Sequence, residues 1–367
     1  MNEIIMYIMA AGAIIGGIDR IAGCRLGLGS KFEEGFMLLG PTALSMAGII
    51  CLTPVLSGLL QKAVVPLWLW LGLDPALLGG ILAIDMGGYQ LAMELAVTPE
   101  IGKYAGLIVA ATFGCTITFT IPVGMGMLKE KDQVFFTRGM LVGIGTLPIC
   151  LTAGGLLCGL NLFTLWFQSL PIWILSAVLV FGIRKYPKQT VGCFSAAASL
   201  IKIIATIGLI LGAVSYMTGL NIIPAMTPVK DAMEIVSSIG IVMLGSLPTA
   251  EILQRLLRHP LNWIGTKTGM SHLSVAGLLI GMVSPVPVLS MMKDMDDCGK
   301  IVNSAALVAS ASAMAAHMGF VFGVAPEYIL PLLGTKIIGG IIGALASLFY
   351  IQKEKQVFNH SSYSPRH

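Results

Sequence analysis

Apolar runs of roughly 18 to 25 residues recur along the whole 367-residue chain, and each is long enough to cross a bilayer as a helix. Hydrophobic residues make up 56% of the sequence and charged residues only 11%, whereas a soluble domain carries about 25% charged residues. No part of the sequence shows the alternating pattern of β-barrel strands. The chain is therefore predicted to be an all-α polytopic membrane protein.

The predicted spanning helices are residues 4–18, 35–60, 102–128, 139–160, 162–183, 201–216, 232–253, 301–324 and 333–351. Two further segments, Pro75–Leu95 and His272–Met292, are interrupted near their centres by Asp85-Met86-Gly87-Gly88 and Ser284-Pro285-Val286-Pro287. Limbs of about nine helical residues rise only ~14 Å, which reaches the midplane of a ~30 Å hydrocarbon core. We therefore expect two re-entrant or broken helical hairpins whose tips meet near the membrane centre.

The two halves of the sequence align in register, so that Met46 falls on Met243 and Gly143 falls on Gly340. Spans, interruptions and loops correspond without a gap. The sequence is accordingly divided into a first transmembrane repeat (1–153), a linker helix region (154–197), a second transmembrane repeat (198–351) and a disordered cytoplasmic tail (352–367).

The distribution of lysine and arginine residues decides between two membrane arrangements. If both interrupted segments cross the membrane, these residues divide nearly evenly between its faces. If both enter and leave on one side, one face keeps only Lys62, Lys103, Lys230 and Lys336. The positive-inside rule favours the second arrangement, with the N-terminus outside and the C-terminus cytoplasmic. The repeats are then inverted, a plan common among secondary transporters.

Asp85 lies in an otherwise uncharged stretch at predicted membrane depth. An ionisable residue there is costly and by default marks a functional site. Gly87 and Gly88 allow the backbone to bend, and Tyr89 offers a ring face or a hydroxyl group to a cation. The alternative is a protonated or paired aspartate with a purely structural role.

Three residues of the second half are further candidates. Ser284 opens the interruption in which prolines free backbone carbonyl groups, although a simple helix kink is the alternative. His317 lies within an apolar span, where it can bond a substrate hydroxyl, relay a proton, or be satisfied between helices. Asn303 lies near the start of the same span. The predicted substrate-binding set is Asp85, Gly87, Gly88, Tyr89, Ser284, Asn303 and His317.

The motifs of several other protein classes do not occur in the sequence. It has no H-E-x-x-H, no phosphate-binding G-x-x-x-x-G-K-[ST] and no G-x-S-x-G, and its seven cysteines form no C-x-x-C pair. No basic patch interleaved with aromatic residues indicates nucleic-acid binding. A secondary transporter or facilitator without a cofactor or metal is therefore favoured over an enzyme or an ATP-driven pump.

Several short motifs together resemble the ethanolamine-utilisation permeases of the EutH type, and the resemblance runs nearly from end to end. They are Asn2-Glu3-Ile4-Ile5-Met6-Tyr7-Ile8-Met9, Phe32-Glu33-Glu34-Gly35-Phe36-Met37, Asp85-Met86-Gly87-Gly88 with Glu94, Met291-Met292-Lys293-Asp294-Met295-Asp296-Asp297, Gly299-Lys300-Ile301-Val302-Asn303-Ser304 and Ala316-His317-Met318-Gly319-Phe320. The resemblance implies a protein of the bacterial cytoplasmic membrane that admits ethanolamine for an ammonia-lyase pathway.

The residues and the resemblance lead to one hypothesis. Ethanolammonium binds between the two hairpin tips with Asp85 as counter-ion, while His317 or Asn303 bonds its hydroxyl group. The expected partners are ethanolamine and the lipid bilayer, with a homo-oligomer allowed and nucleic acid excluded. The alternatives are a cation-coupled symporter for another small amine or amino acid, and a membrane sensor or anchor that transports nothing.

Overall fold

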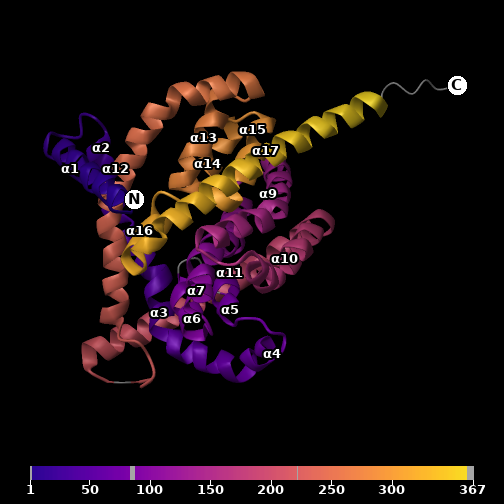
Figure 1. Ribbon diagram of the computed structural model, residues 1–367. Coiled ribbons are helices and arrows are strands. Elements are labelled where there is room, and N and C mark those ends of the chain that lie inside the picture. Colours follow the sequence, from indigo (N-terminus) through magenta and orange to yellow (C-terminus); the bar gives the residue numbers. More distant parts are fainter. Residues whose placement is uncertain (1, 83–86, 221, 362–367) are drawn as a thin grey trace.

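The computed structural model describes residues 2–82, 87–220 and 222–361, and every regular element in these ranges is a helix (Figure 1). The first half contains α1 (Asn2–Ile21), α2 (Leu28–Met37), α3 (Leu39–Ala63), α4 (Val65–Trp70), α5 (Ala76–Leu82), α6 (Gly88–Leu95), α7 (Pro99–Lys103), the π-helices η2 (Tyr104–Gly114) and η3 (Thr116–Thr120), α8 (Ile121–Met127) and α9 (Glu130–Leu157).

The second half follows α10 (Leu162–Lys185) and begins within α11 (Pro187–Thr218). It contains α12 (Val229–Thr268), α13 (His272–Val283), α14 (Pro285–Met291), the 3₁₀ turn η4 (Met292–Asp294), α15 (Asp297–Ser310), α16 (Ala316–Val324), the 3₁₀ turn η5 (Pro326–Tyr328) and α17 (Ile329–Ser361).

Eight helices in the described residues are long and apolar enough to cross a membrane, which confirms an all-α polytopic protein. The helix predicted over 162–183 is α10, whose first residue is Leu162. α11 is longer than predicted, because it begins at Pro187 within the region assigned to the linker. The prediction of one continuous span over 301–324 is wrong, since α15 ends at Ser310 and α16 begins at Ala316.

The interruption between α15 and α16 is held by backbone hydrogen bonds to α13. The amides of Ser312 and Met314 donate to the carbonyl oxygens of Gly281 and Met282, at 3.1 and 2.8 Å. Ser312 has a positive φ of 56°, which an α-helix does not allow. Because each backbone donor needs a partner when buried, these bonds to α13 replace the bonds that a continuous helix would make.

Two pairs of short helices, α5–α6 and α13–α14, are each closed by an aspartate. Asp74 precedes α5 and accepts hydrogen bonds from the amides of Val97 and Thr98, which follow α6, at 3.2 and 3.1 Å. Asp296 follows α14 and accepts from the amide of Ser271, which precedes α13, at 2.8 Å. The chain therefore enters and leaves each pair at one end. Figure 1 shows α5–α6 toward the bottom of the view and α13–α14 toward the top.

The centre of the molecule lies around α15, whose residues 299–310 are all buried. α9 and α17 approach it closely through glycines. A Cβ atom on Gly139 of α9 would meet the carbonyl oxygen of Ile301, and one on Gly343 of α17 would lie 2.7 Å from the carbonyl oxygen of Ala305. Small residues at such contacts are typical of membrane helix packing.

Candidate functional site

The Lys336 side chain is fully buried in α17 and ends among backbone carbonyl groups. Its Nζ donates to the carbonyl oxygens of Ala111 at 2.7 Å, Ala311 at 2.8 Å and Ala309 at 3.3 Å. Ala111 belongs to the π-helix η2, whereas Ala309 and Ala311 lie at the C-terminal end of α15. One ammonium group thus joins the central helices of the two halves.

Local backbone geometry explains why these carbonyl groups are available. The last carbonyl groups of a helix have no partner within it, so the end of α15 at Ser310 leaves acceptors exposed. The same end carries the negative pole of the helix dipole. In η2, the longer hydrogen-bond spacing of a π-helix shifts carbonyl groups away from their α-helical partners. A cation placed between the two elements is stabilised by both.

His317 lies in the first turn of α16 and is fully buried. Its Nδ1 atom lies 3.1 Å from the carbonyl oxygen of Ala311, which also accepts from Lys336. Its backbone amide donates to the carbonyl oxygen of Ser312 at 3.3 Å. The interruption between α15 and α16 therefore fixes the imidazole ring beside the buried ammonium group.

A further bond ties the two halves together at this point, because Thr116 Oγ1 of η3 donates to the carbonyl oxygen of Val308 at 2.8 Å. We call this region the helix crossing; it comprises Ala111, Thr116, Val308, Ala309, Ala311, His317 and Lys336.

Three candidates from the first half lie at the start of α6. Gly87 and Gly88 are buried, and the Tyr89 ring packs edge-on against Phe320 of α16, with ring centroids 5.7 Å apart at 81°. Phe320 follows His317 by one turn. Tyr89 and His317 are thus carried by helices that touch each other. Asp85 lies outside the described residues.

Asn303 and Ser284 belong to the α13–α15 side of the molecule. Asn303 is buried, and its Nδ2 donates to the carbonyl oxygens of Ser274 and Gly299 at 2.7 and 2.8 Å. These bonds tie α13 to α15, which is a structural role. Its Oδ1 has no hydrogen-bond partner among the described residues. No bond in the described part of the chain joins Asn303 to Tyr89 or His317.

Ser284 separates α13 from α14 and lines a cavity of about 230 Å³. The cavity is bounded by α2, α12 and the α13–α14 interruption, and its lining includes Glu34, Glu251, Gln254 and Pro287. The predicted interruption of this segment is confirmed, since α13 ends at Val283. None of the residues of the helix crossing lines this cavity.

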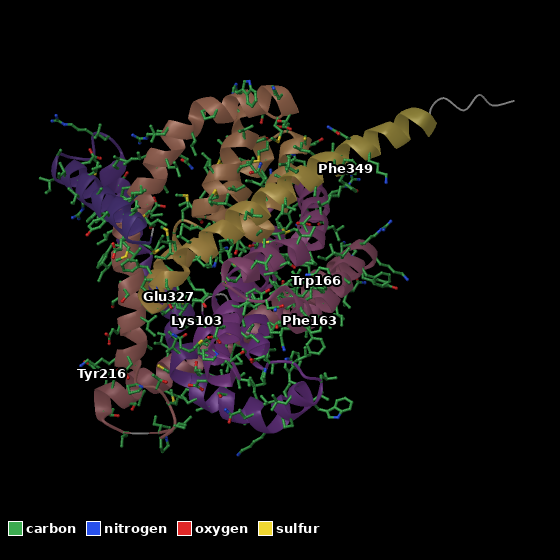
Figure 2. The ribbon with its side chains drawn as sticks, in the orientation of Figure 1. Lys103, Phe163, Trp166, Tyr216, Glu327 and Phe349 are labelled. Atoms are coloured by element: carbon green, nitrogen blue, oxygen red, sulfur yellow. The ribbon has the colours of Figure 1, made fainter. Side chains whose placement is uncertain are left out.

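An ion pair links the two halves at another level. Lys103 Nζ of α7 lies 2.7 Å from Glu327 Oε1 of η5, and 5.1 Å from the centroid of the Tyr328 ring. Figure 2 shows Lys103 and Glu327 close together, beside the start of α17. Both side chains are partly exposed, so the pair can separate at little cost.

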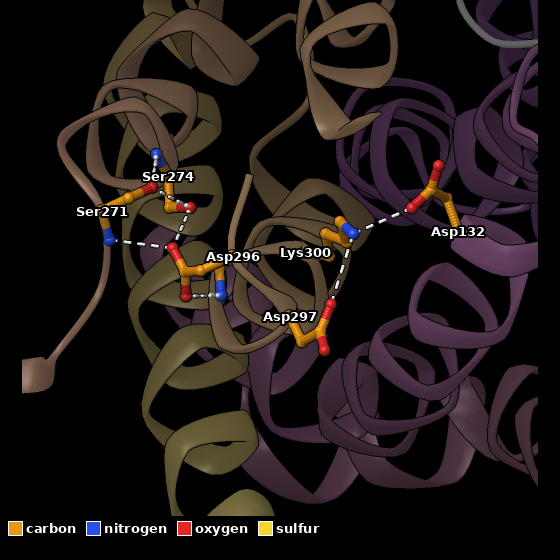
Figure 3. Close-up of polar contacts among 7 residues, drawn as sticks. Asp132, Ser271, Ser274, Asp296, Asp297 and Lys300 are labelled. Atoms are coloured by element: carbon orange, nitrogen blue, oxygen red, sulfur yellow. Dashed lines mark hydrogen bonds and ion pairs between the residues drawn. The ribbon is translucent and has the colours of Figure 1, made fainter. Parts of the chain in front are cut away.

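Several acidic residues of the described chain are bonded within structural networks. Figure 3 shows Lys300 between Asp132, at 2.8 Å, and Asp297, at 3.3 Å. The same view shows Asp296 bonded to Ser274, whose hydroxyl donates at 2.6 Å. The acid-rich segment after α14 therefore caps α15 and holds the start of α13 against it.

Lys336 is the functional candidate that the sequence analysis missed. From the sequence it was counted among the four lysines of one membrane face, and its complete burial in α17 corrects that assignment. The sequence does mark this residue, because Lys336 is the only charged residue between Ile329 and Ile351. The rule that singled out Asp85 applies to it equally, since a lone ionisable residue in an apolar span marks a functional site.

Long apolar helices surround these buried polar groups. Large side chains such as Phe163 (81% exposed), Tyr216 (71%) and Phe349 (69%) cover the outer surface (Figure 2). An apolar exterior with the polar groups buried inside is the arrangement expected of a protein that lies in lipid. The fold and the apolar exterior thus define a multi-pass α-helical membrane protein.

Comparison with known proteins identifies the family. The family model described as "Ethanolamine utilisation protein, EutH" matches residues 1–350. A probable ethanolamine permease EutH of Listeria monocytogenes serotype 1/2a (strain 10403S) is 39% identical over 350 residues, covering 95% of this chain and 94% of that protein. A probable ethanolamine permease EutH of Escherichia coli (strain K12) is 33% identical over 393 residues, with 96% of each chain covered. No solved structure matches the chain. The chain belongs to the EutH family.

Proposed function

We propose that this chain admits ethanolamine through the bacterial cytoplasmic membrane as the ethanolammonium ion, by secondary transport or facilitated diffusion. The printed names of its relatives support the substrate. The contact between Tyr89 and Phe320 carries the choice of site, because it brings α6, which follows Asp85 in the sequence, against the helix that bears His317.

The two ends of ethanolammonium require different partners. We assign the positive end to the Asp85 carboxylate and the hydroxyl group to His317. A second cation near Lys336 would be repelled at low dielectric, so a bound ethanolammonium requires a carboxylate in the same region. Gly87, Gly88 and Tyr89 complete the first half's contribution in this proposal. Asn303, which bonds α13 to α15, and Ser284, which lines a separate cavity, are left out of this site.

The other buried aspartates of the described residues are already bonded. Asp19 accepts hydrogen bonds from three backbone amides, and Asp74 clasps the ends of α5 and α6. Asp132 pairs with Lys300. Asp85, alone in its apolar stretch, therefore remains the best candidate for the substrate counter-ion.

The proposed membrane arrangement has two inverted repeats, 1–153 and 198–351, with one re-entrant pair entering from each face. The aspartate clasps support it, since a segment that begins and ends at one point does not cross the membrane. Alternating access then moves one repeat against the other around a fixed site. A cysteine replacing exposed Val97 should react with an impermeant maleimide from outside, and one replacing exposed Lys267 from inside. Labelling of both from one face would contradict the inverted arrangement.

The decisive experiment compares D85N with wild type in uptake of radiolabelled ethanolamine at mildly acidic pH, where little neutral amine leaks through lipid. Loss of the counter-ion should lower uptake at least about tenfold, the equivalent of ~1.4 kcal/mol. The matched control is D294N, which removes an exposed acid and should behave as wild type. Uptake by D85N at the wild-type rate would contradict the role of Asp85 as counter-ion. If proteoliposomes show no ethanolamine flux, a sensor or anchor is favoured. If another amine competes more strongly than ethanolamine for uptake, a different substrate is favoured.

A further inference from the structure

The carbonyl groups around Lys336 have the composition of a cation site. Three backbone oxygens converge on one point, within 2.7 to 3.3 Å of Nζ, from the π-helix η2 and the interrupted α15. Carbonyl groups of unwound or ending helices at repeat interfaces are the ligands with which secondary transporters hold a coupling ion such as Na⁺. Here the centre of the ligand set is filled by a side chain of the protein itself.

The ammonium group of Lys336 occupies the point on which the three carbonyl oxygens converge. An ammonium has three N–H donors, and the carbonyl groups of Ala111, Ala309 and Ala311 provide three acceptors for them. The side chain is fully buried, and a charge in such a place persists only when it is paired or hydrogen-bonded. While Lys336 occupies this position, a metal cation has no access to the oxygens.

We propose that the Lys336 ammonium group is a tethered substitute for a coupling cation, so that substrate uptake by this protein requires no sodium. It provides the positive charge that holds η2, α15 and α17 together, and it does so without an ion gradient. The consequence for uptake rests on the proposed transport function, whereas the occupied cation site is a property of the fold alone.

The first test measures the thermal unfolding of purified protein in detergent, in sodium chloride and in choline chloride of equal ionic strength. The wild type should unfold at one temperature in both salts. K336A should unfold at a lower temperature, and saturating sodium should raise its Tm by at least about 5 °C, because an emptied site binds the ion in the folded state only. K336M keeps the aliphatic stem in the site, so its Tm should fall without recovery in sodium. K230A, which removes an exposed lysine, is the control and should show no sodium response.

The second test measures ethanolamine uptake by wild-type proteoliposomes with external sodium replaced by choline, and equal rates are expected. Sodium-stimulated uptake or a sodium-dependent Tm of the wild type would overturn the proposal even if K336A failed to fold. A folded K336A that ignores sodium would overturn it as well. Absence of all uptake would refute the transport function but leave the Tm comparison to decide on the site.

Discussion

Lys336 Nζ and His317 Nδ1 lie 2.8 and 3.1 Å from the same atom, the carbonyl oxygen of Ala311. A carbonyl oxygen only accepts hydrogen bonds, so the imidazole nitrogen bonded to it must carry a hydrogen. A neutral ring in this tautomer has its lone pair on Nε2. In that tautomer Nε2 of His317 is an acceptor, while Lys336 supplies a fixed charge beside the ring.

The roles of the two ring nitrogens of His317 can be distinguished by substitution. Asn places an N–H donor near the position of Nδ1 but has nothing at Nε2, whereas Ala lacks both. H317A should lose about 1–3 kcal/mol of stability, because it removes a buried hydrogen bond to Ala311 and leaves a cavity where the ring was. H317N should unfold close to the wild-type temperature, yet take up ethanolamine at least about tenfold more slowly. Thermal unfolding and radiolabelled uptake measure the two effects. If H317N takes up ethanolamine at the wild-type rate, the imidazole ring has only a structural role.

The Lys103–Glu327 ion pair should act as a contact that opens during transport, because it joins the first and second halves of the chain at a partly exposed position. Cysteines at both positions, bridged by a short bifunctional maleimide, should stop uptake. Each single cysteine treated in the same way is the control and should retain it, in a C193S background that removes an exposed native thiol. Stability should change by less than about 1 kcal/mol in either single variant, as for other exposed pairs. Undiminished uptake after bridging would show that this contact does not move.

Two glycines of α9 offer a matched test of packing at the centre of the molecule. A methyl group on Gly139 would meet the carbonyl oxygen of Ile301 and lie 3.1 Å from the amide nitrogen of Ala305, whereas one on Gly145 would meet nothing within 4 Å. G139A should therefore cost about 1–3 kcal/mol through overpacking. G145A should be neutral or slightly stabilising, since alanine favours the helix. Equal Tm values for the two variants would mean that α9 and α15 are less closely packed than described.

The hydropathy pattern sufficed for the long helices, because length and apolar composition alone determine which segments can span a bilayer. Interruptions were predictable only where a residue type announces them. The prolines after Ser284 lack a backbone N–H donor and mark the end of α13. The break after Ser310 carries no such mark, since its alanine-rich sequence favours a helix. It depends on the bonds from Ser312 and Met314 to α13, which are tertiary and absent from any local pattern.

The candidate site was predictable in part for the same reason. Tyr89 and His317 were singled out by residue type, and their helices do meet through Phe320. Asn303 was also singled out by its residue type, but its side-chain amide donates to backbone carbonyl groups of α13 and α15. Only the packing of these helices determines that structural role. Lys336 was counted as a charge of one membrane face, although the predicted span 333–351 contains it. Only the convergence of carbonyl groups from two distant elements explains how α17 buries it.

Asp296 should make the stability of the α13–α15 region depend on pH. Burial alone would raise the pKa of this carboxyl, but hydrogen bonds from the Ser274 hydroxyl and from the amides of Ser271 and Gly299 outweigh it, and the pKa lies below its ordinary value. A carboxyl with a lowered pKa in the folded state stabilises the protein above its unfolded pKa of about 3.9. That contribution is lost as the pH falls through the folded pKa.

D296N keeps the size of the side chain but has no carboxylate to titrate. Near neutral pH it should unfold at a lower temperature than the wild type, since it weakens the cap on Gly299 as well as the clasp, and a cap alone contributes about 1 kcal/mol. The difference in Tm should shrink as the pH is lowered from about 6 toward 3, because only the wild type loses a charged acceptor. D294N should follow the wild type throughout, as its acid is exposed. A constant difference across this range would show that the Asp296 carboxylate contributes no more than a neutral amide in the same place.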